Sequence, residues 1–450
     1  MLKTEPSMGV SPIRSEGRRR IARRRSVIHE LFPPEYELLP QVNQIYELEL
    51  AWAEYQALTE DELVTRGAYC RSINGRTTHH FHICMNTPEQ YNVAASRRRK
   101  NFFAANLFAV GYATHGLFPY RGKFHPQMIK AIMNIIGLRP GDVVLDPMVG
   151  CGTTLIEASI IGINSIGVEI SPFAALMSEA KLGGLEMDCE RFPQLLERAD
   201  EIFDFFSRRQ GASYQLPLAS LGGPLDLAGL FEEQPALYKL ILLCYLDTMG
   251  YTRRQKSRTA QELFPEVLKR YFAAVRAFNE SRQELGLTIG SSCVVIGDAR
   301  RLGLPDASVD GIIFSPPYSF AIDYLENDRP QLEYLGVDVD AIKANLVGLR
   351  GDGRTRRERI KIRVRNYFED MDRILAECSR VLRPERFCVI VVGSNINQTG
   401  GIALEEKIIE LGEGHALPLD FRIVRQIEGI RNTMRNEHLL FFRKANSNSP

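Results

Sequence analysis

From residue 123 onward, the chain alternates short apolar segments with segments of helical periodicity. This alternation is typical of a parallel sheet that is covered by helices on both faces. The expected strands are short and rich in β-branched residues; they cover residues 142–146, 165–170, 293–298, 310–314, 387–393, 421–425 and 438–442. The sequence therefore predicts an α/β fold with a doubly wound, mostly parallel sheet of seven strands.

Residues outside the sheet pattern predict three further units. An arginine-rich start indicates a flexible arm, and an N-terminal extension follows it, with a helix expected at 45–58 and a strand at 78–84. A long segment of helical periodicity separates the second and third strands, where loops usually have about 2–6 residues, so we expect an inserted helical subdomain. The expected units are the basic arm at 1–30, the extension at 31–110, the sheet domain at 111–182 and 290–445, and the helical insertion at 183–289.

Charge is balanced over the chain but is unevenly distributed. Lys+Arg 56 and Asp+Glu 55 leave a net charge of +1, which alone gives no argument for nucleic-acid binding. Basic residues nevertheless cluster, and clusters on a neutral chain predict a surface that faces a polyanion. A solvated surface is the alternative. The residues that we expect to contact nucleic acid are Arg97, Arg98, Arg99, Arg354, Arg356, Arg357 and Arg359. The extension and the helical insertion are further candidates for such contacts.

Cysteine spacing and hydropathy exclude several classes of protein. The two nearest of the 8 cysteines, Cys378 and Cys388, have no C-x-x-C spacing, so we expect no metal site. No apolar stretch approaches the roughly 18 residues of a membrane-spanning helix. The N-terminus also lacks the apolar core of a secretory signal. We expect a cytoplasmic protein with reduced cysteines and no membrane contact.

A glycine turn follows the first strand of the expected sheet and leads into a helix. Glycine lacks the Cβ atom that would keep a ligand away from the backbone. The spacing differs from G-x-G-x-x-G, because Leu155 occupies the third glycine position, and no Gly-Lys-Ser/Thr follows to make a P-loop. The candidate ligand-binding residues here are Asp146, Pro147, Gly150, Gly152, Thr153 and Thr154, the last two as candidate helix caps.

Carboxylates also end the next two strands. Glu169 and Ile170 end the second strand, and Asp298 and Ala299 end the third. Glu169 lies close to the offset at which an acid reaches ribose hydroxyls in doubly wound folds. Asp146 would repel an anion in the same pocket. The three acids therefore predict a site for a nucleoside with a neutral or cationic appendage, whereas a turn-forming or helix-capping role is the alternative for each acid alone.

The fourth strand ends in Ser315, Pro316, Pro317 and Tyr318. Two consecutive prolines cannot donate hydrogen bonds to a sheet, so the strand must stop there. The result is a rigid, extended turn that presents a hydroxyl, free carbonyls and an aromatic ring at the edge of the expected pocket.

The glycine turn and this Ser-Pro-Pro-Tyr segment, in this order, resemble the motifs of the amino-methylating DNA methyltransferases, which modify N4 of cytosine or N6 of adenine. In that family the first motif binds S-adenosylmethionine and the second holds the target amino group. The serine form is most typical of the N4-cytosine branch. Residues 111–116 and 120–127 are similar to the segment that closes the methionine pocket. The resemblance also implies that the last strand of the sheet is antiparallel.

The resemblance implies a role for each candidate residue. Asp146, Pro147, Gly150 and Gly152 would contact the methionine part of S-adenosylmethionine, Glu169 the ribose, and Asp298 the adenine amino group. His115, Lys123 and Phe124 would close the methionine pocket, although each also fits a structural role. The serine hydroxyl and the Pro316 carbonyl would accept hydrogen bonds from the target amine, whose lone pair then points at the methyl group. Tyr318 would stack on a base flipped out of a DNA duplex.

The resemblance thus implies a site-specific DNA cytosine-N4 methyltransferase, with a cognate restriction nuclease as a further expected partner. N6-adenine methylation is the nearest alternative, because the same pocket chemistry serves either amine. The tRNA guanine-N2 methyltransferases are a second alternative, although they usually have Asp or Asn before the two prolines. A fold that only binds nucleic acid is the third. Methylation of cytosine carbon 5 is disfavoured, since that reaction uses a cysteine, usually beside a proline, and the sequence has no Pro-Cys pair.

Overall fold

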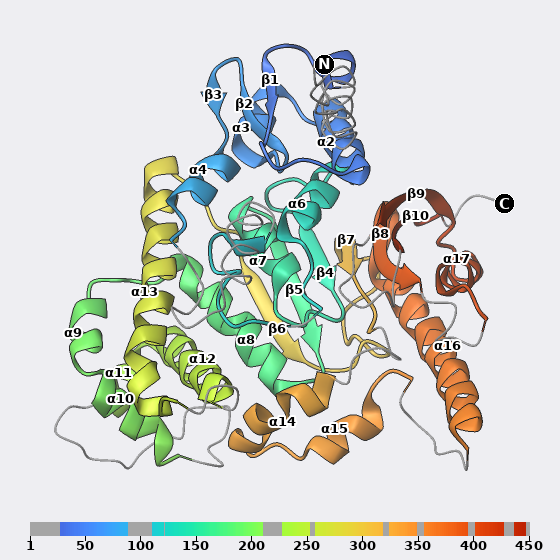
Figure 1. Ribbon diagram of the computed structural model, residues 1–450. Coiled ribbons are helices and arrows are strands. Elements are labelled where there is room, and N and C mark those ends of the chain that lie inside the picture. The colour runs from blue at the N-terminus through green and yellow to red at the C-terminus, as the bar shows by residue number, and fades with distance from the viewer. Residues whose placement is uncertain are drawn as a thin grey trace, which may run out of the picture.

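The computed structural model describes residues 28–88, 110–120, 122–209, 227–252, 257–317, 324–348, 355–394, 401–426 and 436–446. Within these residues, a seven-stranded sheet forms the centre of the molecule, and a three-stranded sheet forms a smaller N-terminal module (Figure 1). A group of helices lies beside the central sheet on the left of that view.

The seven-stranded sheet has the order β6-β5-β4-β7-β8-β10-β9. β10 is antiparallel to both of its neighbours, and the pairs among β4 to β8 are parallel. The prediction of a mostly parallel, seven-stranded sheet with an antiparallel last strand is therefore confirmed. The strands are β4 (Val143–Asp146), β5 (Asn164–Glu169), β6 (Ser292–Ile296), β7 (Val309–Phe314), β8 (Leu382–Ser394), β9 (Leu419–Gln426) and β10 (Asn436–Arg443).

Successive residues of β4 and of β7 contribute to different hydrophobic cores, because side chains alternate between the two faces of a sheet. Val144 and Ile313 pack with helices α6 (Pro126–Ile135) and α7 (Thr153–Ile160). Leu145 and Ile312 instead pack with α16 (Arg356–Val381) and α17 (Leu404–Gly414). This doubly wound arrangement brings the carboxyl ends of β4, β5, β6 and β7 to one edge of the sheet.

The N-terminal module packs on α6 through buried polar contacts. Asn134 of α6 accepts a hydrogen bond from Arg66 Nε at 2.6 Å and donates one to Glu54 Oε1 at 2.5 Å. Burial of such groups is tolerable only when they are hydrogen-bonded, so these contacts fix how the module sits. The module comprises β1 (Tyr36–Leu38), α2 (Ile45–Ala57), α3 (Glu60–Arg66), β2 (Cys70–Ile73), β3 (Arg76–Thr77) and α4 (His79–Asn86).

The predicted strand at residues 78–84 is wrong, because these residues begin helix α4. Thr78 caps the helix, and its side chain accepts a hydrogen bond from the Phe81 N–H at 3.3 Å. The buried residues of the helix are His80, Ile83 and Cys84, which have the spacing of one helical face rather than of a strand. The helix predicted at 45–58 corresponds to α2.

The segment between β5 and β6 is helical, as the sequence predicts. Its core also includes residues of α14 and α15, so that two connections far apart in the sequence share one cluster of buried side chains. No helix in the described segments is long and apolar enough to cross a membrane. The elements are α8 (Pro172–Gly183), the 3₁₀ helix η2 (Gly184–Glu186), α9 (Phe192–Glu197), α10 (Ala199–Ser207), α11 (Leu227–Glu233), α12 (Pro235–Thr252), α13 (Ala260–Leu285), α14 (Tyr324–Tyr334) and α15 (Val339–Asn345).

Candidate active site

Asp146 ends β4 and lies beneath the glycine turn, where it is buried. Its Oδ2 atom accepts a hydrogen bond from Thr154 Oγ1 at 2.6 Å, and its Oδ1 atom accepts one from the Met148 N–H at 3.0 Å. Burial raises the pKa of Asp146 to about 7. Asp146 and Thr154 therefore hold the turn from within, and neither contributes to the wall of the neighbouring cavity.

The two glycines of the turn have different surroundings. Both have a positive φ, of 52° at Gly150 and 83° at Gly152, which favours glycine. A Cβ atom on Gly152 would lie 3.0 Å from Ser178 Oγ and 3.1 Å from its Cα, so Gly152 allows α7 to pack closely on α8. A Cβ atom on Gly150 would lie 3.6 Å from the Tyr120 ring, and Gly150 lines the cavity.

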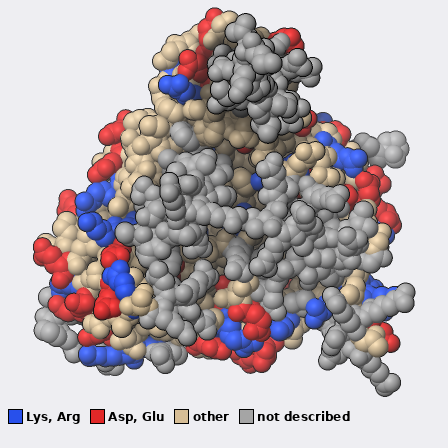
Figure 2. Space-filling view, in the orientation of Figure 1, with Lys and Arg blue, Asp and Glu red and all other residues tan. Residues whose placement is uncertain are grey.

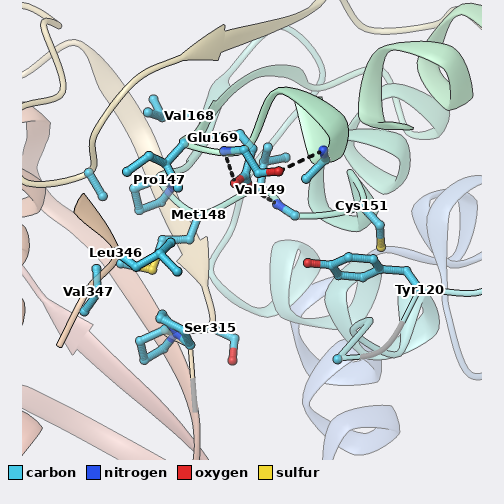
Figure 3. Close-up of a pocket in the computed structure, with 18 of the residues that line it drawn as sticks. Tyr120, Pro147, Met148, Val149, Cys151, Val168, Glu169, Ser315, Leu346 and Val347 are labelled. Atoms are coloured by element: carbon cyan, nitrogen blue, oxygen red, sulfur yellow. Dashed lines mark hydrogen bonds between the residues drawn. The ribbon is translucent and has the colours of Figure 1, made fainter. Parts of the chain in front are cut away.

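Glu169 ends β5, and its side chain is hydrogen-bonded to the glycine turn. Its Oε2 atom accepts a hydrogen bond from the Gly150 N–H at 2.8 Å, and its Oε1 atom accepts one from the Ser171 N–H at 2.9 Å (Figure 3). Burial raises the pKa of Glu169, and these N–H donors counteract that rise. The carboxylate thus connects the ends of two neighbouring strands and forms part of the cavity wall.

Asp298 follows β6 at the same edge, beside Glu169 in the cavity wall. Both of its carboxylate oxygens accept hydrogen bonds from Arg300, with Oδ2 at 2.5 Å from Nη2 and Oδ1 at 2.9 Å from Nε. The side chain of Asp298 is 38% exposed, and Asp298 lines the cavity.

Residues 315–317, hereafter the Ser-Pro-Pro corner, and the glycine turn at 147–151 line one cavity with a volume of about 180 Å³. Ser315 directly follows β7, whereas Met148 and Val149 belong to the turn after β4. Figure 3 shows Ser315 on the same side of the cavity as Met148 and shows the Tyr120 ring entering from the opposite side. Predicted residues in the wall are Lys123, Phe124, Pro147, Gly150, Thr153, Glu169, Ile170, Asp298, Ala299, Ser315, Pro316 and Pro317.

Several residues of the wall are absent from the sequence prediction. Leu325 and Asp328 come from α14, and Asn345, Leu346 and Val347 come from the end of α15 and the segment after it. They approach the cavity because α14 and α15 pack on the helical insertion, and no motif marks this tertiary contact. Tyr120 was detectable, since it lies within the segment at 120–127 that resembles the pocket-closing segment.

His115 and Lys123 are close to each other but differ in their relation to the cavity. His115 is buried behind the wall, where its Nε2 atom lies 2.6 Å from Glu157 Oε1. Lys123 lines the cavity, and its Nζ atom donates hydrogen bonds to the carbonyls of Val110 and His115, both at 2.6 Å. Burial lowers the pKa of Lys123 to about 7 and that of His115 to about 4.

Other predicted residues lie outside what the structure describes. Tyr318, Arg97, Arg98, Arg99 and Arg354 belong to undescribed segments. The first turns of α16 include Arg356, Arg357 and Arg359, whose side chains are not described either. Figure 1 shows this end of α16 at the lower right, on the same side of the molecule as α14 and α15.

Comparison with known proteins agrees with this arrangement. Residues 117–192, which include the glycine turn and Glu169, match the model of the RMKL-like methyltransferase domain. The Type II methyltransferase M.BsoBI of Geobacillus stearothermophilus is 27% identical over 277 residues, which are 51% of this chain and 54% of that protein. Over these segments the chain is thus similar to S-adenosylmethionine-dependent methyltransferases.

Two further relatives match shorter segments. The Type II methyltransferase M.MjaII of Methanocaldococcus jannaschii is 47% identical over 68 residues, covering 15% of this chain and 13% of that protein. The tRNA (guanine(10)-N2)-dimethyltransferase of Methanothermobacter thermautotrophicus is 38% identical over 53 residues, covering 12% of this chain and 16% of that enzyme. The chain therefore spans about half the length of M.BsoBI and far less of these two.

The residues of the cavity fit S-adenosylmethionine, the cofactor of this domain. Carboxylates such as Glu169 and Asp298 accept hydrogen bonds from hydroxyl and amino groups, which the nucleoside part of the cofactor supplies. Apolar side chains of Val168, Leu346 and Val347 offer surfaces for a planar base (Figure 3). The acidic groups near the glycine turn suit a cationic cofactor better than a polyphosphate.

Proposed function

We propose that the protein is a DNA methyltransferase that transfers a methyl group to the exocyclic N4 amine of cytosine. The observation that carries this proposal is the shared cavity of the Ser315 corner and the Gly150 turn. Transfer requires the group that accepts hydrogen bonds from the amine to lie beside the site of the methyl donor, and residues that we propose for each role line this cavity. The Type II methyltransferases among the relatives support DNA as the substrate.

The proposed mechanism depends on alignment rather than on a strongly shifted pKa in the Ser-Pro-Pro segment. Ser315 Oγ and the Pro316 carbonyl would accept hydrogen bonds from the two amine hydrogens, which localises the nitrogen lone pair and directs it along the transfer axis. When bound, the cofactor would supply a methyl group activated by a cationic sulfur. The bond from sulfur to the methyl carbon would break as the bond from nitrogen to that carbon forms, S-adenosylhomocysteine would leave, and the amine would lose one proton to water. Glu169 and Asp298 would hold the nucleoside end, and the wall around Tyr120 and Lys123 would close the methionine end.

The position of the corner explains why we propose base flipping. Ser315 is partly buried and Pro316 is buried, so a base stacked inside a duplex cannot reach them. Rotation of the base out of the duplex would bring its amine to the corner, where Tyr318 would stack on it. We propose that the DNA phosphates are contacted by Arg354, Arg356, Arg357 and Arg359 and by Arg97, Arg98 and Arg99. A cognate restriction nuclease would complete a modification system.

A second candidate is guanine-N2 methylation of tRNA. The observation in its favour is the match to two tRNA (guanine(10)-N2)-dimethyltransferases, at 38% identity over 53 residues and 44% over 45 residues. These short matches cover 12% and 10% of this chain. Serine before the two prolines favours the cytosine reaction instead, since the tRNA enzymes usually have Asp or Asn there.

One experiment distinguishes these reactions. The full chain is incubated with deuterium-labelled S-adenosylmethionine and, separately, with unmodified duplex DNA, single-stranded DNA and tRNA, and the digested nucleosides are identified by mass spectrometry. We expect labelled N4-methylcytosine from duplex DNA. Labelled N6-methyladenine would contradict the choice of base, and labelled N2-methylguanosine from tRNA alone would contradict DNA as the substrate.

A matched pair of variants tests the role of the corner. Ser315→Ala should lower the rate of transfer on the order of 100-fold, as loss of one aligned hydrogen-bonding group does in other active sites. Ser308→Ala, just before the other end of β7, should leave the rate unchanged, because the Ser308 hydroxyl donates a hydrogen bond to the nearby Pro305 carbonyl at 2.7 Å and Ser308 does not line the cavity. Equal rates for both variants would contradict the role of Ser315.

A further inference from the structure

Arg300 connects three parts of the chain at the edge of the cavity. Its guanidinium donates to the Asp298 carboxylate after β6, to Asp370 Oδ1 of α16 at 3.0 Å, and to the Asn345 carbonyl at the end of α15 at 2.7 Å. Four of the five N–H groups of a guanidinium are thereby used. The Arg300 side chain is 11% exposed, and its partner Asp370 is fully buried.

Asp370, which pairs with Arg300, also binds the backbone of the segment that follows α15. It is fully buried, and its Oδ2 atom accepts a hydrogen bond from the Gly348 N–H at 3.0 Å. Gly348 has a φ of 73°, and a Cβ atom there would lie 3.0 Å from the Cβ of Tyr367, one turn earlier on α16. Residues 345–348, hereafter the wall segment, are thus held at both ends by one ion pair.

The wall segment and Asp298 line the same cavity, and Arg300 Nη2 donates hydrogen bonds to both Asp298 and Asn345. Asn345, Leu346 and Val347 belong to its wall together with Asp298 and the end of β5. Figure 3 shows Leu346 and Val347 on the side of the cavity that carries Pro147 and Met148, away from Tyr120. Arg300 therefore orients the Asp298 carboxylate, and it also holds the backbone of the wall segment, which carries the apolar side chains of Leu346 and Val347.

We propose that Arg300 is a positioning residue for the adenine end of the cofactor pocket, paired with Asp370. Its planar guanidinium holds the Asp298 carboxylate in the orientation that accepts a hydrogen bond from the 6-amino group of adenine, and it holds the wall segment against the base. Lysine cannot replace it, because one ammonium group cannot bind a carboxylate in fork geometry and also reach Asp370 and Asn345. This inference rests on the proposed use of S-adenosylmethionine but not on which base is methylated.

The test compares two cofactor products that differ at one position of the base. S-adenosylhomocysteine has the 6-amino group, whereas S-inosylhomocysteine has an oxygen there, which a carboxylate repels. Isothermal titration of the full chain gives the ratio of their dissociation constants. For Arg300→Met, we expect the preference for the adenosyl ligand to fall by about 10-fold or more, the size of one charged hydrogen bond. Arg300→Lys should also lose much of the preference.

Controls separate positioning from a merely structural role. Arg301→Met removes a neighbouring exposed arginine and should leave the ratio unchanged. A structural defect would weaken both ligands equally and would also leave the ratio unchanged. If Arg300→Met does not fold, Arg300→Lys and Asp370→Asn carry the test. An unchanged ratio in all folded variants of this pair would overturn the inference, whereas failure of the unaltered protein to bind S-adenosylhomocysteine would overturn the cofactor assignment itself.

Discussion

Gly152 offers a direct test of how the glycine turn is built. Its φ of 83° costs an alanine about 1–2 kcal/mol relative to glycine. An alanine Cβ would also lie 3.1 Å from the backbone Cα of Ser178, which cannot move without shifting α8. Such overpacking costs about 1–3 kcal/mol. Gly152→Ala should therefore lower the free energy of unfolding by about 2–5 kcal/mol.

A second glycine isolates the packing contribution. Gly286 ends α13 with a φ of 62°, and a Cβ atom there would meet nothing within 4 Å. Gly286→Ala should therefore cost only the backbone part, about 1–2 kcal/mol. Urea denaturation followed by circular dichroism gives the free energy of unfolding of both variants. The comparison is valid when the slope of this free energy against urea concentration is the same for both. Equal destabilisation by the two substitutions would refute the inferred packing of α7 on α8.

Three further perturbations test the cavity and the arginines in the first turns of α16. Ser315→Ala should leave the dissociation constant of S-adenosylhomocysteine unchanged in calorimetry while it lowers the rate of transfer; a loss of cofactor binding would contradict its role at the amine. The pKa of Asp146 is about 7 in the folded chain and 3.8 in the unfolded chain. Between these two pH values the folded chain binds the proton and the unfolded chain does not, so the free energy of unfolding should fall as pH rises from 4 to 7. Asp146→Asn should remove that slope in urea titrations, and parallel curves for the two proteins would contradict it. Replacing Arg356, Arg357 and Arg359 with alanine should weaken DNA binding and flatten the dependence of log K on log salt by about 3, and an unchanged slope would exclude phosphate contacts.

The sheet and its glycine turn were predictable because they depend on local patterns. Buried parallel strands have short runs of β-branched residues, and the residues that end them lie at one edge, which is how Glu169 and Asp298 were found. Helix α4 was missed because its apolar positions, spaced as in a helix, occur in a short segment with several histidines. Thr78, which is the N-cap in the structure, was the local signal that could have identified the helix.

The wall contributed by α14 and α15 was not predictable from the sequence. Leu346 and Val347 reach the cavity only because α14 and α15 pack on helices more than a hundred residues earlier and because Arg300 holds Asn345. Long-range contacts of this kind leave no periodicity or motif. The positions of Asp146 and Gly152 also depend on packing, since both face the interior of the turn rather than the cavity.

The most direct test of the central claim is a crystal structure of the full chain with S-adenosylhomocysteine and a DNA duplex that contains the target site. The account predicts a flipped cytosine whose amine contacts Ser315 Oγ and the Pro316 carbonyl, with the cofactor sulfur in line with that amine beside Gly150. A cofactor bound elsewhere, or a serine hydroxyl directed away from the base, would contradict it.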